Sequence, residues 1–371
     1  MQSARQLRVV MAGGGTAGHL YPGVAVARAL LGLDPSAQIT FAGTRRGLET
    51  RLVPREGFEL DLIRSTGLKG KSPAALLRGL ATLPLSALDA WRVISKRSPR
   101  LVIGLGGYSS GPVVAAAALR GIPTMLLEQN ALPGLTNRML ARVVRAAAVT
   151  YPESLPYFGA VGFVSGNPVR PEFVEARDER ANAGGASGRV RVLVFGGSQG
   201  AHAINTALAE AAPEIARLSD RLHLTHQTGE RDLEPVRAAY RAAGLDQTVV
   251  RVESFLHEMS GEMTRADLVV CRAGASTLAE LAAIGRAALL IPLPSAADDH
   301  QRRNAEVLRA VGAADVLDQV GMTGSSLVQR IGDLAADGER LARMAEAMHG
   351  FARPDAAEVI ARRALTVVAP A

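Results

Sequence analysis

The chain has 371 residues, of which 48% are hydrophobic, 21% charged and 4% aromatic, and its formal net charge is +7. This length predicts two domains, and the ordinary apolar fraction excludes an intrinsically disordered chain. The single cysteine, Cys271, excludes an internal disulfide framework and favours a reducing compartment, and no run reaches the roughly 18–20 apolar residues of a membrane-spanning helix, so we expect a cytosolic protein.

Short apolar runs alternate with Ala- and Leu-rich helical stretches, a pattern typical of βαβ units with parallel sheets. In chain order the predicted strands are Leu7–Ala12, Gln38–Ala42, Leu101–Ile103, Thr124–Glu128, Ala146–Val149, Val190–Phe195, Leu222–Thr225, Thr248–Val252, Leu268–Cys271 and Ala288–Pro292. Arg8–Thr16 and Arg191–Gly200 both run from a strand into glycines. We therefore predict an α/β fold of two Rossmann-like domains whose parallel sheets face each other across a cleft.

The predicted domains are 1–168 and 169–351. The prolines of Asn167–Pro171 and the polar, Gly-rich stretch that ends at Gly188 indicate a hinge and linker. The tail has helical patterning, and we expect a helix within 352–371 to pack back on the first domain.

Positive charge is concentrated between Arg64 and Arg100, where eight basic residues stand against the single acid Asp89. Such a segment indicates an anionic partner, namely a membrane surface, a nucleic acid or a phosphorylated substrate. The alternative is a basic face that is simply exposed to solvent. A nucleic-acid site is disfavoured because the chain lacks a recognisable motif and aromatic residues interleaved on a strand platform.

Two glycine motifs resemble nucleotide-binding sequences without completing them. Gly13–Gly18 satisfies G-x-G-x-x-G after a strand, but the next strand ends at Gly43-Thr44 without the carboxylate that would hold a dinucleotide ribose. Gly70-Lys71-Ser72 lacks the upstream glycine of a P-loop, because Ser65 stands there. A dinucleotide-dependent oxidoreductase therefore remains only an alternative.

Further glycine loops follow strands at Gly104–Gly111 and Gly196–Gly200, where they serve either a ligand or a tight turn. In Ala266–Glu280 a buried strand ends at Arg272, and a helix is expected to open with Ser276 and Thr277 at capping positions. The free backbone amides at the start of this helix and the guanidinium of Arg272 could then bind a diphosphate. Glu280 either binds a ribose diol or stabilises the helix dipole, and no spacing of histidines with cysteine or carboxylates indicates a metal site.

Seven motifs together resemble the MurG family, the bacterial peptidoglycan glycosyltransferases. They are GGGTAGHLYPG (13–23), GGYSSGP (106–112), EQNALPGLTNR (128–138), GNPVR (166–170), GGSQG (196–200), CRAGASTLAE (271–280) and DHQRRNA (299–305). The resemblance implies a GT-B fold and metal-independent, inverting transfer of N-acetylglucosamine from UDP-N-acetylglucosamine to the 4-hydroxyl of lipid I, which forms lipid II. It implies no cofactor. Other UDP-sugar enzymes of the same fold, such as a glycolipid glycosyltransferase or an epimerase, are the alternatives.

The resemblance implies that domain 1–168 binds the acceptor and the membrane and that domain 169–351 binds the donor. Carried over by motif, it implies a donor site and an acceptor or membrane site. The donor residues are Thr16, Ala17, Gly18, Asn130, Arg170, Ser198, Leu256, Arg272, Ala275, Ser276, Thr277, Leu278, Ala279, Glu280 and Gln301, and the acceptor or membrane residues are Tyr108, Asn137, Lys69 and Lys71. Many relatives have an amide where this chain has His300, which affects the detail of sugar recognition.

His19 is the predicted catalytic base, because a helix N-terminus favours the neutral imidazole that can accept a proton. A polar capping role is its alternative, and Glu128 is the rival base. Leu68–Arg97 interleaves basic residues with leucines and Trp91, which suits the lipid interface, although some of these leucines are expected in the core. We expect a peripheral protein on the cytoplasmic face of the inner membrane, with an anionic membrane surface and other cell-wall synthesis and division proteins as partners.

Overall fold

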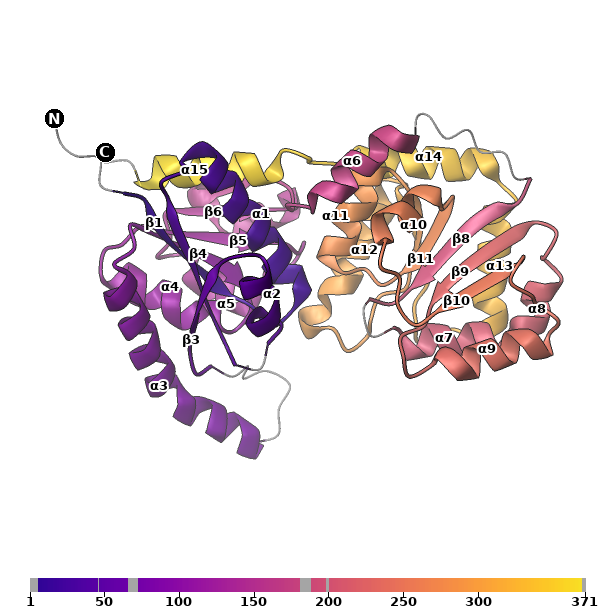
Figure 1. The fold of residues 1–371 in the computed structure, drawn as a ribbon, viewed down its shortest axis with the longest axis horizontal. Helices are drawn as coiled ribbons and strands as arrows, with labels where there is room; N and C mark the ends of the chain where they lie inside the picture. The colour runs from indigo at the N-terminus through magenta and orange to yellow at the C-terminus, as the bar shows by residue number, and fades with distance from the viewer. Residues whose placement is uncertain (1–5, 46, 66–72, 181–187, 198–199, 369–371) are drawn as a thin grey trace. The chain divides into compact units, whose positions relative to one another are not determined.

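The structure, a computed structural model, describes residues 6–45, 47–65, 73–180, 188–197 and 200–368 (Figure 1). Over 73–81 and 177–180 it describes the backbone alone. The chain divides into two compact units: unit 1 is Met1–Arg170 with Arg353–Ala371, and unit 2 is Pro171–Ala352.

Unit 1 contains, in its described part, a seven-stranded sheet of order β3-β2-β1-β4-β5-β6-β7 in which all neighbours run parallel. Its strands are β1 (Arg8–Gly13), β2 (Gln38–Gly43), β3 (Glu59–Leu62), β4 (Leu101–Gly106), β5 (Thr124–Glu128), β6 (Ala146–Val149) and β7 (Gly162–Val164). The strand order reverses between β1 and β4, and ligands of doubly wound sheets bind at the carboxyl ends of strands at such a switch point.

The helices of unit 1 cover this sheet. They are α1 (Ala17–Leu33), α2 (Glu49–Arg55), α3 (Pro73–Arg97), α4 (Ser110–Leu119), α5 (Leu135–Leu140), the 3₁₀ turns η1 (Pro152–Tyr157) and η2 (Gly159–Val161), and α15 (Ala356–Val368). The C-terminal helix α15 lies along α1 and buries Ile360, Ala361 and Ala364 in the core beside Leu20 and Leu30 (Figure 1). This burial explains the apolar spacing of the tail.

Unit 2 contains, within the described ranges, a six-stranded parallel sheet of order β10-β9-β8-β11-β12-β13. Its strands are β8 (Val190–Phe195), β9 (Leu222–Gln227), β10 (Val250–Glu253), β11 (Leu268–Cys271), β12 (Ala287–Leu290) and β13 (Ala314–Val316). Its helices are α6 (Pro171–Arg180), α7 (His202–Glu210), α8 (Ala212–Ala216), α9 (Leu233–Ala242), α10 (Met259–Arg265), α11 (Ala275–Ile284), the 3₁₀ turn η3 (Ala297–Asp299), α12 (His300–Ala310), α13 (Gly324–Ala335) and α14 (Gly338–His349). Here the switch point lies between β8 and β11.

The predicted fold class is confirmed: both units are parallel-sheet α/β structures. Strands β5, β6, β8 and β11 have the predicted bounds, because strands buried on both faces read as continuous apolar runs. The edge strands β7 and β13 were not predicted, because three residues carry too little pattern.

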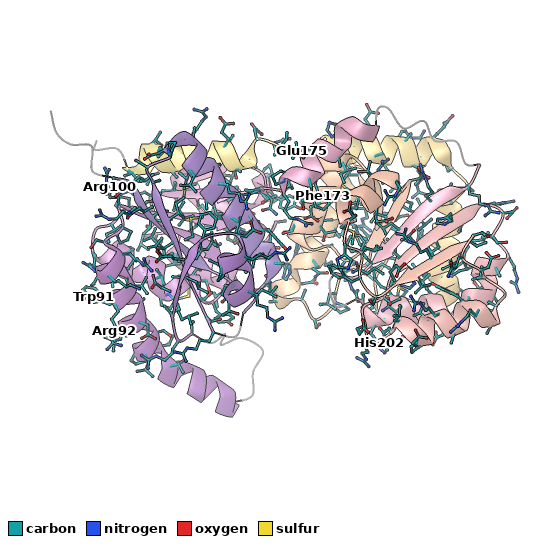
Figure 2. The ribbon with its side chains drawn as sticks, in the orientation of Figure 1. Trp91, Arg92, Arg100, Phe173, Glu175 and His202 are labelled. Atoms are coloured by element: carbon teal, nitrogen blue, oxygen red, sulfur yellow. The ribbon has the colours of Figure 1, made fainter. Side chains whose placement is uncertain are left out.

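The prediction of a linker is wrong for one segment of the chain, which forms a helix. Residues Pro171–Arg180 form helix α6, which packs on α10 and α11 and buries Phe173 (Figure 2). The proline at the first helical position suits a helix start, because its missing N–H would have no intrahelical partner there.

Candidate functional site

The predicted site loops of unit 1 follow strands β1, β4 and β5, which are neighbours in the sheet. His19 lies in the first turn of α1, and its Nδ1 lies 3.1 Å from Oε1 of Gln129, the residue that follows β5. Gln129 Nε2 donates to the carbonyl oxygen of Leu105 in β4 at 3.0 Å. Gly106 and Gly107 approach the imidazole so closely that a Cβ on Gly106 would lie 3.0 Å from its Cε1. The His19 ring of unit 1 therefore lies at the switch point, in contact with the residues that follow β4 and β5.

The glycine loop of unit 1 already holds a carboxylate. Glu49, at the start of α2 and 0% exposed, accepts hydrogen bonds from the Gly15 amide at 2.9 Å and from the Thr44 amide at 2.7 Å. A Cβ on Gly14 or Gly43 would lie 2.7 Å from this side chain. Because a pyrophosphate would need the Gly15 amide that Glu49 occupies, the loop is unsuited to a dinucleotide, despite its G-x-G-x-x-G spacing.

Glu128, the rival base, is buried at the end of β5 with 3% exposure. Its carboxylate accepts hydrogen bonds from the amide and Nδ2 of Asn130, the amide of Gly134 and Nδ2 of Asn137, at 2.9–3.3 Å. Burial raises the pKa of Glu128, and these hydrogen bonds oppose that rise. A carboxylate with four donors, shielded from solvent, is arranged to hold the 130–137 loop rather than to accept a substrate proton.

The other predicted residues of unit 1 lie in varied settings. Asn137 is buried at 2% exposure and also donates to the Leu127 carbonyl, whereas Tyr108 is 41% exposed. The Arg170 guanidinium stacks 5.1 Å from the ring centre of Tyr21. Thr16, Ala17, Gly18 and Asn130 are exposed or half-buried at the strand ends, and Lys69 and Lys71 lie outside the described residues.

Helix α11 begins at the switch point of unit 2. Its cap is Gly274, in an extended conformation and without a side-chain cap bond, so the predicted capping role of Ser276 and Thr277 is wrong. These residues lie inside the first turn, because the helix begins at Ala275. The amides of residues 275–277 therefore point out of the helix start, as a diphosphate site requires. Glu280 lies one turn later at 9% exposure, and Leu278 and Ala279 complete the predicted stretch.

Gln227 connects two further donor segments. Its Nε2 donates to the Gly197 carbonyl at 3.0 Å, and its Oε1 accepts from the Leu256 amide at 2.9 Å. Leu256 is buried, while Ser198 lies outside the described residues. The end of β9 thus ties the loop after β8 to the loop that carries Leu256.

Arg272 has other partners than the expected diphosphate. It donates to the Ile291 carbonyl at 2.9 Å and to Gln319 Oε1 at 2.6 Å, and burial lowers its pKa. These bonds join the ends of β11 and β12. The geometry therefore favours a bracing role for Arg272.

The loop before α12 holds Gln301 in place, because Gln301 Oε1 accepts from the Leu293 amide at 3.0 Å. The adjacent Asp298 and Asp299 both have left-handed backbone conformations, with φ of 56° and 53°. Such conformations cost non-glycine residues free energy and concentrate at ligand-binding sites. His300 Nδ1 lies 2.7 Å from the Ala297 carbonyl, which keeps its ring on its own turn.

Helix α3 combines exposed apolar side chains with paired charges. Leu83, Leu85, Leu88 and Trp91 are 41–49% exposed, whereas Ala90 and Ile94 of the same helix are buried. Figure 2 labels the Trp91 side chain on α3. These leucines are therefore not core residues. Several expected free cations are paired, however, in the bonds Arg64–Asp89, Lys96–Asp61, Arg97–Asp61 and Arg97–Glu59. Burial alone would raise the pKa of Asp61, but the hydrogen bonds from Arg97 and Lys96 lower it.

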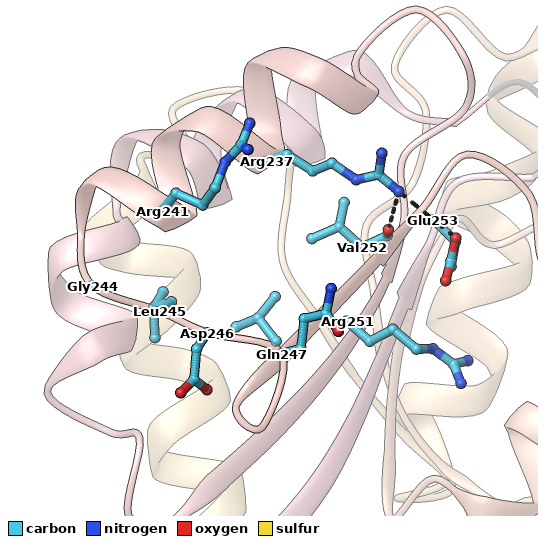
Figure 3. A pocket seen from close by; sticks show the side chains of 10 residues that line it. Arg237, Arg241, Gly244, Leu245, Asp246, Gln247, Arg251, Val252 and Glu253 are labelled. Carbon is cyan, nitrogen blue, oxygen red and sulfur yellow. Dashed lines mark hydrogen bonds and ion pairs between the residues drawn. The ribbon is translucent and has the colours of Figure 1, made fainter.

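A cavity of about 780 Å³ lies on unit 2 between α9 and β10 (Figure 3). Arg237 spans one side of it, donating to the Val252 carbonyl and pairing with Glu253. Of the described predicted donor residues, none lines it. The cavity is thus separate from the loops after β8 and β11.

Over the described ranges, no group of three or more His, Cys, Asp or Glu side chains is arranged to hold a metal ion. Likewise, no described helix is long and apolar enough to cross a bilayer.

Sequence reasoning missed Glu49, Gln129 and Gln227 as organising residues. Gln129 stands inside the quoted EQNALPGLTNR motif, so its position was a usable signal, whereas Gln227 lies two residues beyond the predicted strand Leu222–Thr225. Glu49 carried no such signal, because its partner Gly15 is 34 residues away in the chain.

Comparison with known proteins places these loops in a family. The chain matches the glycosyltransferase family 28 N-terminal domain over residues 9–149 and the glycosyltransferase family 28 C-terminal domain over residues 191–360. It is 44% identical, over 96% of this chain and 91% of the relative, to the UDP-N-acetylglucosamine--N-acetylmuramyl-(pentapeptide) pyrophosphoryl-undecaprenol N-acetylglucosamine transferase of Myxococcus xanthus (strain DK1622). It is 45% identical, with the same coverage, to the protein of that name from Anaeromyxobacter sp. (strain K).

A solved structure supports the same family assignment. The crystal structure of Acinetobacter baumannii MurG is similar, with a TM-score of 0.80 and 31% identity over 97% of this chain and 99% of that chain. The predicted GT-B fold is therefore confirmed, and the chain belongs to glycosyltransferase family 28 and, within it, to the MurG family.

Proposed function

We propose that this protein transfers N-acetylglucosamine from UDP-N-acetylglucosamine to the 4-hydroxyl of lipid I, undecaprenyl-pyrophosphoryl-N-acetylmuramoyl-pentapeptide, and so forms lipid II for peptidoglycan synthesis. The observation that carries the proposal is the start of α11, where first-turn amides stand one turn before the Glu280 carboxylate. Amides at a helix start suit a diphosphate, and a carboxylate suits the two hydroxyls of a ribose. The family membership supports this choice of substrates.

The donor is assigned to unit 2. In the proposal the amides of 275–277 bind the diphosphate, Glu280 binds the ribose, and Leu256 contacts the uracil. Gln301 donates to the sugar through Nε2, since its Oε1 is held by the Leu293 amide. Ser198 and Ala275–Ala279 of unit 2 complete the proposed donor contacts, with Arg272 bracing the loops around them. Thr16, Ala17, Gly18, Asn130 and Arg170 of unit 1 stay donor contacts predicted from the resemblance.

The acceptor chemistry is assigned to His19. His19 Nε2 removes the proton of the acceptor 4-hydroxyl while that oxygen attacks C1 of N-acetylglucosamine. The bond between C1 and the UDP oxygen breaks on the opposite side, so the configuration at C1 inverts and UDP leaves with the bonding electrons. Amides at the α11 start stabilise the charge that develops on the diphosphate. Glu128 and Asn137 hold the 130–137 loop in position, and Tyr108 is proposed to contact the acceptor.

The direct test is release of UDP from UDP-N-acetylglucosamine when a water-soluble lipid I analogue is added, without added metal. His19→Ala is expected to lower kcat by about 100-fold or more while the Kd for UDP-N-acetylglucosamine is unchanged. Substitution of the exposed His257 by alanine is the matched control and leaves kcat unchanged. Turnover of His19→Ala within a few-fold of the parent would exclude His19 as the base.

The exposed apolar side chains of α3, Leu83, Leu85, Leu88 and Trp91, are proposed to lie in the interface of an anionic membrane, on the cytoplasmic face of the inner membrane. Apolar side chains enter the acyl boundary, and nearby cations attract acidic headgroups by about 1 kcal/mol each. Lys69 and Lys71 are the proposed cations, since Lys96 and Arg97 pair with Asp61. Contacts with other cell-wall synthesis and division proteins are part of the same proposal.

Vesicle binding tests the membrane assignment. Trp91 is the only tryptophan of the chain and is one of these exposed side chains, so its emission is expected to shift to the blue when anionic vesicles are added. Raised salt, Lys69→Glu with Lys71→Glu, or Leu85→Ser with Leu88→Ser should each weaken the shift. The control is Leu119→Ser, on α4, whose side chain is 84% exposed. Binding that ignores both salt and these substitutions contradicts the assignment.

A further inference from the structure

Gln129 has an unusually constrained side chain for a residue in a loop. It is 3% exposed, and both ends of its amide have partners on neighbouring elements of unit 1. Nε2 donates to the Leu105 carbonyl at 3.0 Å, and Oε1 lies 3.1 Å from His19 Nδ1. The amide therefore connects the end of β4 to the first turn of α1.

These two contacts determine the orientation of the amide. A backbone carbonyl only accepts hydrogen bonds, so the end of Gln129 that faces Leu105 must be the NH₂ group. The end that faces His19 must then be the oxygen, which also only accepts. Hydrogen positions follow from such a network rather than from the heavy atoms alone, and here the network permits one arrangement. His19 Nδ1 must carry the proton.

The surrounding backbone keeps the ring in that geometry. Gly106 has φ of 96°, and a Cβ there would lie 3.0 Å from His19 Nδ1 and 3.4 Å from Gln129 Oε1. A Cβ on Gly107 would lie 3.5 Å from His19 Cδ2. The imidazole thus packs against a glycine backbone on the side where any side chain would displace it.

We propose that Gln129 is a positioning residue that selects the tautomer of neutral His19 with the proton on Nδ1, which leaves the lone pair on Nε2 as the proton acceptor. The inference deepens the proposed function and rests on it, because the tautomer matters to the reaction only if His19 is the base. Outer hydrogen-bond partners commonly determine which nitrogen of a histidine is available.

An amide suits this role better than a carboxylate. A carboxylate beside Nδ1 would stabilise the imidazolium, whereas a neutral amide orients the ring without favouring its charged form. The carboxylates of the adjoining segments have other partners: Glu49 accepts from Gly15 and Thr44, and Glu128 accepts from Asn130, Gly134 and Asn137. Gln129 therefore orients the His19 ring without a negative charge that would favour the imidazolium.

The first test observes the tautomer directly. The full-length protein is labelled with ¹⁵N-histidine, the His19 signals are assigned by their loss in His19→Gln, and ring nitrogen shifts are recorded above the pH at which the ring is neutral. The parent is expected to show a protonated Nδ1 and an unprotonated Nε2. Gln129→Leu should lose this preference and show averaged or reversed shifts. A parent with its proton on Nε2 would overturn the proposal.

The second test separates positioning from simple support of the fold. Gln129→Leu is expected to lower kcat about 10- to 100-fold with little change in the KM for UDP-N-acetylglucosamine. Gln129→Glu still accepts from Nδ1–H, so it should keep the tautomer and more of kcat, while the acid limb of its pH–rate profile moves to higher pH because the carboxylate stabilises the imidazolium. Gln6→Leu, the same change at an exposed glutamine of unit 1, is the control.

Trp91 fluorescence during urea unfolding checks that each variant keeps unit 1 folded. If Gln129→Leu is too unstable, the ¹⁵N shifts of the parent and of Gln129→Glu decide, because a proton on Nε2 of neutral His19 in either protein would overturn the inference. Equal kcat and an unchanged tautomer in Gln129→Leu contradict the inference. A parent that shows the Nδ1–H tautomer but releases no UDP with lipid I analogues would instead contradict the proposed function.

Discussion

Acidification from pH 7 to pH 5 is expected to destabilise unit 2 through one buried residue, His226 in β9. The ring is 0% exposed, its Nε2 lies 3.0 Å from Asn205 Oδ1, and its Nδ1 lies 3.0 Å from the Tyr240 hydroxyl. Because Asn205 Nδ2 donates to the Thr228 carbonyl and to Asp232, Asn205 Oδ1 accepts from His226 Nε2–H. Nδ1 then accepts from Tyr240, and the neutral ring is fully hydrogen-bonded.

The magnitude follows from the pKa. Burial lowers the pKa of His226 from 6.5 to about 3, with the charge of Asp232 acting weakly against it. The folded-state pKa lies below the unfolded value, so the unfolded chain binds the additional proton. Stability is therefore lost as the pH falls below about 6.5, and the loss levels off only near pH 3. Linkage gives a loss of about 2 kcal/mol between pH 7 and pH 5 from this residue.

The assay must report on unit 2 alone. Trp91 lies in unit 1, so its fluorescence serves as an internal reference, and hydrogen exchange of peptides from β9, corrected for intrinsic rates, measures the free energy of opening of unit 2. Between pH 7 and pH 5 this free energy should fall about 2 kcal/mol further in the parent and in the control His257→Gln than in His226→Gln. His223, whose pKa is lowered by burial and nearby arginines, contributes equally to all three. An equal loss in His226→Gln would refute the reasoning.

Three further predictions concern other parts of the molecule. Glu49→Ala leaves the Gly15 and Thr44 amides without their acceptor and should lower the free energy of unfolding of unit 1 by about 3 kcal/mol, measured by Trp91 fluorescence in urea, with Glu49→Gln losing less; equal stability of parent and Glu49→Ala would contradict this. UDP at 100 times its Kd should stabilise the protein by about 2.7 kcal/mol and raise Tm, whereas NAD should not, and the reverse result would revive an oxidoreductase. Thr323→Ala removes the side chain that caps α13 at Ser326 and should cost about 1 kcal/mol, seen as faster hydrogen exchange in α13 but not in unit 1.

The sequence by itself determined where the strands lie and which loops follow them. A parallel strand covered on both faces must be apolar along its length, and a strand-to-helix turn that approaches a ligand needs glycine. Both features can be recognised from residues that are consecutive in the chain. The strands β5, β8 and β11 and the segments Gly13–Gly18 and Cys271–Glu280 were therefore recognisable without a structure.

Only the tertiary structure decided which side chains meet at those loops. Glu49 enters the glycine loop from 34 residues away, Gln129 reaches His19 across 110 residues, and Asp61 pairs with Lys96 across 35. The local pattern of apolar and polar residues does not predict such pairs. Each pair depends on the order of strands in the sheet, and on burial, which raises the free energy of an unpaired charge or amide. Glu128, which the sequence offers as the rival base, is surrounded by four hydrogen-bond donors in the fold.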